Sequence, residues 1–238
     1  MKKFDLQGTG VALVTPFHKQ GTIDFTSLGR LIDHTIEGGV DYLVSLGTTS
    51  EYPTLSSQEQ LAVVEFTIEK VENRVPVVLG MGGNDTRSLV DKIRQTDMSS
   101  IAAILSVAPY YNKPNQKGLY AHYKAIAEAS NTPIILYNVP GRCGVNMTAE
   151  TTLQLANDFS NIIGIKEASG NMAQCMDILA NKPQGFTVVS GEDALVLPMI
   201  ALGAQGVISV AANAYPNIMS ELVTHSLKSN MKKARAVH

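Results

Sequence analysis

Residues 133–167 read PIILYNVPGRCGVNMTAETTLQLANDFSNIIGIKE, and they give the clearest indication of the architecture. A short apolar run ends at Tyr137, apolar residues at helical spacing follow over Thr148–Asp158, and a second apolar run covers Ile162–Lys166. Strand, helix and strand in this order are typical of a unit with two parallel strands, because the helix returns the chain to the starting edge of the sheet.

The same alternation extends through the chain in both directions. The predicted strands are Gly10–Thr15, Asp41–Ser45, Val75–Gly80, Ala102–Ser106, Pro133–Tyr137, Ile162–Lys166, Phe186–Ser190 and Gly206–Ser209. The predicted helices are Asp24–Glu37, Ser57–Glu72, Asp85–Asp97, Gln116–Ala129, Thr148–Asp158, Met172–Ala180 and Ala194–Leu202, with an eighth after Pro216.

Eight such units predict a closed α/β fold, the (β/α)8 TIM barrel. A doubly wound open sheet usually shows a Gly-x-Gly-x-x-Gly turn after its first strand, whereas here that strand runs into Thr15-Pro16-Phe17. No linker or shift in composition divides the chain, so we expect a single barrel domain over residues 1–238.

Charge and cysteine content limit the partners. The net charge is −2, without long runs of like charge, so nothing favours nucleic acid or an anionic membrane, and a small molecule fits better. No apolar run approaches the length of a membrane helix. The two cysteines, Cys143 and Cys175, have no framework or metal-type spacing, and we expect reduced thiols in a cytoplasmic protein.

Lys166 is the most informative residue. It ends an apolar strand, and reacting groups of a barrel enzyme lie at the carboxyl ends of the strands. A lysine in an apolar mouth loses hydration of its ammonium form, so its pKa falls and the amine becomes a nucleophile that can form a Schiff base with a ketone. The alternative is an ion pair with a carboxylate such as Glu167.

Four other residues at strand ends fit such chemistry. The phenol of Tyr137 could relay protons, although a core tyrosine is the simpler interpretation. Thr48 and Thr49 could hold a carboxylate, but Gly-Thr-Thr also fits an ordinary turn. Arg142 could bind a second carboxylate from the loop after Tyr137, or remain a solvated cation. The histidines show no ligand spacing, and no metal is indicated.

Five motifs together resemble the dihydrodipicolinate synthase family of pyruvate-dependent class I aldolases, from about Gly8 to the end of the chain. They are Gly47-Thr48-Thr49-Ser50-Glu51, Pro109-Tyr110-Tyr111-Asn112-Lys113-Pro114, Tyr137-Asn138-Val139-Pro140-Gly141-Arg142, Gly164-Ile165-Lys166-Glu167-Ala168-Ser169-Gly170 and Gly206-Val207-Ile208-Ser209-Val210. The resemblance implies a Schiff-base lyase that condenses pyruvate with L-aspartate 4-semialdehyde to give 4-hydroxy-tetrahydrodipicolinate in lysine and diaminopimelate biosynthesis.

The resemblance also implies residue roles. Lys166 would form the imine with pyruvate, whose carboxylate Thr48 and Thr49 would hold. Tyr137, Thr48 and Tyr111 would relay protons, with Tyr111 reaching into the site of a neighbouring subunit of a homo-oligomer, a dimer of dimers. No cofactor is expected, because the imine is itself the electron sink.

Three further residues would contact the substrates. By the same resemblance, Arg142 would bind the carboxylate of aspartate semialdehyde, and Gly191 and Ile208 would line the pocket through their main chains. Related sugar-acid aldolases usually lack the arginine, which favours the synthase. A sugar-acid aldolase and a catalytically silent barrel that binds a keto acid remain the alternatives.

The chain departs from the family pattern in places. Ser50 replaces a glycine of Gly-Thr-Thr-Gly-Glu, which we expect to be neutral unless its backbone is left-handed. The family's C-terminal helical segment is expected to be largely absent.

Residues that hold inhibitory lysine in sensitive relatives are only partly kept. Asn84 and Tyr110 are present. Ser88 replaces a carboxylate, and histidines are replaced by Ser57 and Gln60. Weak or absent inhibition by lysine is therefore expected.

Overall fold

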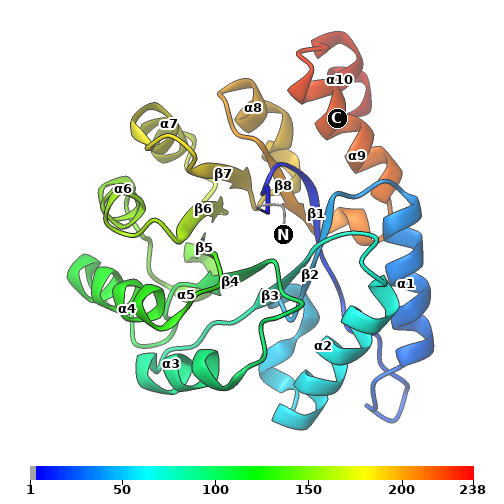
Figure 1. Ribbon diagram of the computed structural model, residues 1–238. Coiled ribbons are helices and arrows are strands. Elements are labelled where there is room, and N and C mark those ends of the chain that lie inside the picture. The colour runs from blue at the N-terminus through cyan, green and yellow to red at the C-terminus, as the bar shows by residue number, and fades with distance from the viewer. Residues whose placement is uncertain (1–3) are drawn as a thin grey trace.

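The computed structural model describes residues 4–238. Within them, parallel strands form a closed barrel in the order β1 to β8, with helices around it (Figure 1). The predicted (β/α)8 barrel is confirmed. The strands are β1 (Gly8–Ala12), β2 (Tyr42–Ser45), β3 (Val77–Gly80), β4 (Ala103–Val107), β5 (Ile134–Asn138), β6 (Ile162–Glu167), β7 (Thr187–Ser190) and β8 (Gly206–Ser209).

The longer helices lie outside the barrel, and short 3-10 turns lie at its mouth. The α-helices are α1 (Phe25–Glu37), α2 (Ser57–Val71), α3 (Thr86–Gln95), α4 (Gln116–Ala129), α5 (Pro140–Cys143), α6 (Ala149–Asp158), α7 (Met172–Asn181), α8 (Val196–Ala201), α9 (Pro216–Leu227) and α10 (Met231–Val237). The 3-10 turns are η1 (Thr48–Ser50), η2 (Tyr52–Thr54), η3 (Asp193–Leu195) and η4 (Ala211–Asn213). No helix within residues 4–238 is long and apolar enough to cross a membrane.

The first strand differs from its prediction. We expected Gly10–Thr15, but β1 begins two residues earlier and ends at Ala12. Its start is fixed by the partner strand, because Gly8 pairs with Gly206 of β8. Its end is fixed by a side chain, because the backbone N–H of Val14 donates to Asn213 Oδ1 at 3.2 Å instead of to a strand.

Two helices were not predicted. One is the single turn α5, and the other is α10 near the end of the chain. Each spans at most two turns, which is too short for apolar periodicity to reveal. The turn α5 begins with Pro140, a residue suited to the first helical position, and it carries Arg142, which we had expected in a loop.

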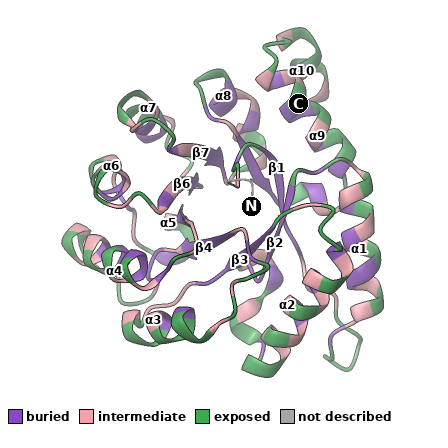
Figure 2. Cartoon of the chain, viewed as in Figure 1, coloured by how far each residue is buried: buried purple, intermediate pink, exposed green. Residues whose placement is uncertain are grey.

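Burial follows the barrel geometry. The strands are buried along nearly their whole length, whereas the surrounding helices bury one side only (Figure 2). This matches the sequence pattern, because strands covered on both faces read as continuous apolar runs and the helices as amphipathic segments. The mouth of the barrel is thereby left as the place where polar side chains gather.

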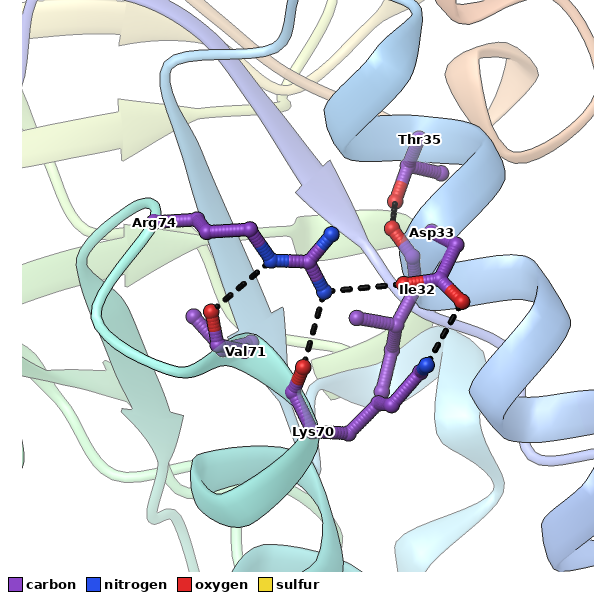
Figure 3. A network of polar contacts seen from close by, with 6 residues as sticks. All are labelled: Ile32, Asp33, Thr35, Lys70, Val71 and Arg74. Atoms are coloured by element: carbon purple, nitrogen blue, oxygen red, sulfur yellow. Dashed lines mark hydrogen bonds and ion pairs between the residues drawn. The ribbon is translucent and has the colours of Figure 1, made fainter.

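An ion-pair network joins α1 to the end of α2 on the outer surface (Figure 3). Lys70 Nζ lies 2.6 Å and an Arg74 nitrogen 2.8 Å from the two carboxylate oxygens of Asp33. Hydrogen bonds from these two cations lower the pKa of the Asp33 carboxyl group. All three side chains remain about one-third exposed, so solvent screening keeps the contribution to stability below about 1 kcal/mol.

The barrel closes where β1 meets β8, and this seam requires glycine. A Cβ atom added to Gly206 would lie 2.0 Å from the carbonyl oxygen of Gly8. Backbone atoms cannot move aside as a flexible side chain can. A side chain at residue 206 is therefore incompatible with the observed closure.

We predict that Gly206→Ala lowers the free energy of unfolding by the upper part of the range of about 1–3 kcal/mol typical of overpacking, or by more. Urea denaturation followed by circular dichroism measures the change. Gly83→Ala is the matched control, because a Cβ there meets no atom within 4 Å. Equal stabilities of the two variants would contradict the account of the seam.

Candidate active site

A cavity of about 280 Å³ opens at the carboxyl ends of the strands. This size suits a small acid rather than a nucleotide or a large cofactor. The cavity is lined by Thr48, Thr49, Tyr137, Val139, Arg142, Lys166, Gly191, Glu192, Asp193, Ala194 and Val210. It therefore brings together six of the eight residues that the sequence singled out.

Lys166 lies at the wall of this cavity and is only 3% exposed. Register pairs it with Tyr137 of β5 on one side and Val189 of β7 on the other. Burial lowers the pKa of Lys166 to about 8, against the opposing effect of the carboxylates of Asp193 and Glu192. At pH 7 about one-tenth of the amine would then be neutral, compared with well below one-thousandth for an ordinary lysine.

The ion pair between Lys166 and Glu167 is not found. Residues alternate between the faces of a strand, so Glu167 points away from the cavity, and its carboxylate accepts hydrogen bonds from Asn138, Ser169 and Gln174. Among residues 4–238, no carboxylate oxygen lies within the 4.0 Å ion-pair distance of Lys166 Nζ. The cation is thus buried without a contacting counter-charge.

Tyr137 lies directly beside the lysine. The Nζ atom of Lys166 is 4.5 Å from the centroid of the Tyr137 ring. Burial raises the pKa of the Tyr137 phenol, while Thr48 and Arg142 act in the opposite direction. The phenol is therefore a protonated group next to the amine, in a position where it can exchange a proton with a group bound to Lys166.

The Gly-Thr-Thr segment forms the 3-10 turn η1 beside these two residues. Thr48 and Thr49 line the cavity and are half-buried. Ser50 is buried, and its hydroxyl donates to the carbonyl of Gly47 at 2.7 Å. The left-handed backbone in this turn lies at Glu51, with φ of 58°, and not at Ser50, so serine replaces glycine here without backbone strain.

Arg142 and Gly191 lie at the cavity in different ways. Arg142 is exposed on α5 and supplies a cation to the cavity wall. Gly191 leaves space for the lysine, because a Cβ at this residue would lie 2.9 Å from Lys166 Cε and 2.5 Å from Ala168 Cβ. Any side chain at residue 191 would displace the amine.

Two of the predicted residues lie outside this cavity. Tyr111 is 86% exposed, has a left-handed backbone with φ of 67°, and does not line the cavity. Ile208 is fully buried in β8, in register with Gly10, and Val210 lines the cavity wall on that side. Their roles remain predictions.

Sequence reasoning missed several lining residues. Glu192 and Asp193 follow Gly191 after the end of β7, so their position at a strand end could have found them. Asp193 Oδ2 accepts hydrogen bonds from the backbone N–H groups of Val210 and Ala211 at 3.1 and 2.8 Å. This carboxylate thereby joins η3 to the segment that follows β8.

Residues from the expected lysine-binding cleft line a second cavity, of about 760 Å³, between α2 and α3. Its wall includes Ser57, Gln60 and Ser88. Lys92 Nζ donates to Gln60 Oε1 at 2.7 Å, so a cation already occupies part of this wall. Asp85 is engaged as the N-cap of α3. These contacts are consistent with weak or absent inhibition by lysine, which stays a prediction.

Comparisons with known proteins find relatives over the whole length of the chain. A 4-hydroxy-tetrahydrodipicolinate synthase of Parabacteroides distasonis is 52% identical over all 238 residues, which cover 80% of its length. The structure of the synthase from Methylacidiphilum fumariolicum superposes with a TM-score of 0.95 at 41% identity, over 98% of this chain and 78% of that one. A monomeric dihydrodipicolinate synthase variant matches with a TM-score of 0.94 at 40% identity, over the same shares.

The family model described as the dihydrodipicolinate synthetase family matches residues 5–238. That match includes every strand of the barrel and every residue that lines the cavity. The chain belongs to the dihydrodipicolinate synthetase family.

Proposed function

We propose that this chain condenses pyruvate with L-aspartate 4-semialdehyde to give 4-hydroxy-tetrahydrodipicolinate, the product named in its relatives. The observation that carries the proposal is the buried amine of Lys166, with no contacting carboxylate among the described residues, in a small cavity beside Tyr137. Arg142 at the same cavity favours a second substrate that carries a carboxylate.

The chemistry proceeds through a covalent link to Lys166. Its neutral amine attacks the ketone carbon of pyruvate, and loss of water gives a protonated imine. Removal of a proton from the methyl carbon gives an enamine, whose carbon attacks the aldehyde of the second substrate. The amine of that substrate then displaces the Lys166 nitrogen, which closes the ring and frees the lysine.

Each of these steps moves a proton, and Tyr137 is the group that carries it. The phenol lies beside the amine, and its raised pKa keeps it protonated at neutral pH. Thr48 is close enough to affect that pKa, so it would pass the proton onward. Thr48 and Thr49 would also hold the pyruvate carboxylate with their hydroxyl and N–H groups.

The proton relay would be completed by a second copy of the chain. Tyr111 is exposed and lies outside the cavity of its own barrel, which suits a residue that enters a neighbour's site. We therefore propose a homo-oligomer, a dimer of dimers, although one structural relative is a monomeric variant.

The two cysteines are buried free thiols, in keeping with a reducing, cytoplasmic location.

We predict that Lys166→Ala forms no covalent adduct when treated with pyruvate and borohydride, whereas the parent gains one. Because the lysine pKa is lowered to about 8, adduct formation by the parent should rise as the pH increases through 8. Mass spectrometry measures the adduct. Lys117→Ala, on the exposed surface of α4, is the control. Turnover by Lys166→Ala at the parent rate would exclude the imine mechanism.

We predict that Tyr137→Phe lowers kcat by about 100-fold or more, with little change in stability, because the ring is kept and the proton carrier is lost. Steady-state kinetics and thermal melting measure the two effects. Tyr215→Phe, at a largely exposed tyrosine, is the control. An unchanged kcat would remove Tyr137 from the proton relay.

We predict that Arg142→Ala raises the KM for aspartate semialdehyde by at least about tenfold, because a charged hydrogen bond contributes about 1.5–3 kcal/mol. The KM for pyruvate should change far less, and sugar-acid aldehydes should remain poor substrates. Arg94→Ala, on the exposed surface of α3, is the control. Equal increases in both KM values would contradict the assigned role.

A further inference from the structure

A buried polar cluster lies directly behind the catalytic strands. Asn138 and Glu167 follow Tyr137 and Lys166 by one residue, and they pair with each other across β5 and β6. Because side chains alternate along a strand, these two point away from the cavity, toward the surrounding helices. Asn138 is fully buried and Glu167 is 1% exposed.

The Glu167 carboxylate is held by N–H groups alone. Asn138 Nδ2 lies 3.0 Å and Gln174 Nε2 3.1 Å from Oε2, and the backbone N–H of Ser169 donates to Oε1 at 2.6 Å. Within residues 4–238, no ion pair includes Glu167. Burial of a carboxylate is costly unless it is well hydrogen bonded, and these three donors meet that requirement.

The direction of these hydrogen bonds is fixed by the main chain. Asn138 Oδ1 accepts from the backbone N–H of Met147 at 3.0 Å, so its amide nitrogen must face Glu167. Gln174 Nε2 donates to the carbonyl of Met147 at 3.1 Å, and its oxygen accepts from Asn146 at 2.8 Å. Neither amide can rotate without losing these bonds. Residue 167 must therefore supply oxygen atoms that only accept.

The cluster joins the segments that carry the reactive groups. Its members come from β5, which carries Tyr137, from β6, which carries Lys166, and from the end of the segment 139–147, which carries Arg142. Gln174 adds α7, which lies outside β6 and β7 (Figure 1). One carboxylate thus links the strands of Tyr137 and Lys166 and, through Asn138, the end of the segment that carries Arg142.

We propose that Glu167 is a positioning residue. Its buried carboxylate, bonded to Asn138 and Gln174, holds the side chains of Lys166 and Tyr137 in the relative positions that imine formation requires. The proposal rests on the proposed function, because it requires that Lys166 react with pyruvate. Lys166 Nζ lies 4.5 Å from the Tyr137 ring centroid, and a shift of about 1 Å in such an arrangement can cost up to about 100-fold in rate.

The test is Glu167→Gln, which keeps the shape but turns an NH₂ group toward donors. The rate of borohydride-trapped adduct formation with pyruvate alone, per folded molecule, should fall between about 10-fold and 100-fold. The pH midpoint of trapping should rise, because a loosened mouth admits water to Lys166 and reduces the effect of burial. Glu150→Gln, on the exposed first turn of α6, is the matched control and should behave as the parent.

Two further variants keep the proposal testable if Glu167→Gln folds poorly. Glu167→Asp retains an acceptor and should keep a higher trapping rate than Glu167→Gln. Gln174→Leu removes one donor but leaves Asn138 and Ser169 in place, so trapping should slow by a smaller, several-fold amount. Parent rates in Gln174→Leu, or a rate in Glu167→Asp no higher than in Glu167→Gln, would overturn the proposal.

A purely structural role has a different signature. Variants of Glu167 would then melt at lower temperature, while the folded molecules would trap pyruvate at the parent rate with the parent pH midpoint. That result would overturn the positioning role and leave the proposed function intact. Failure of the parent itself to form an adduct would instead refute the proposed function.

Discussion

The candidate active site depends on one buried amine, Lys166 Nζ, that no carboxylate of residues 4–238 contacts. Lys166 has its stem in an apolar strand, and burial is the largest of the effects that shift its pKa, which it lowers. Asp193 and Glu192 oppose this from the cavity wall, beyond ion-pair distance, and the resulting pKa is about 8. A carboxylate in direct contact would hold the ammonium form, and a fully apolar wall would not favour the protonated imine.

Because a strand has two faces, the barrel can present reactive side chains to the cavity and hydrogen-bonded side chains to the helix layer. On β5 and β6, the inward residues Tyr137 and Lys166 face the cavity, while the outward residues Asn138 and Glu167 bond to each other and to the helix layer. The residues proposed to react and the residues proposed to position them are thus one residue apart in sequence and on opposite faces of the sheet. Gly191 completes the arrangement, because only a residue without a Cβ leaves room for the lysine.

The barrel and its reactive pair could be predicted because both depend on local sequence. Apolar periodicity indicates eight strand and helix units, and the end of an apolar strand is where Lys166 and Tyr137 stand. Features set by distant partners could not be predicted. The end of β1 depends on Asn213, about two hundred residues away, and the hydrogen-bond partners of Glu167 lie on other elements, Asn138 on β5 and Gln174 on α7.

The cluster around Glu167 also explains why a costly carboxylate is retained in the core. An apolar residue at this position would leave one N–H of the Asn138 amide and the backbone N–H of Ser169 without their acceptor, each at a cost of about 1–3 kcal/mol. A glutamine at this position would turn its NH₂ group toward one of these N–H donors, because Met147 fixes the orientation of the Asn138 and Gln174 amides. The members are therefore interdependent, and the free energy spent on burying one charge gives a rigid frame behind the flexible lysine side chain.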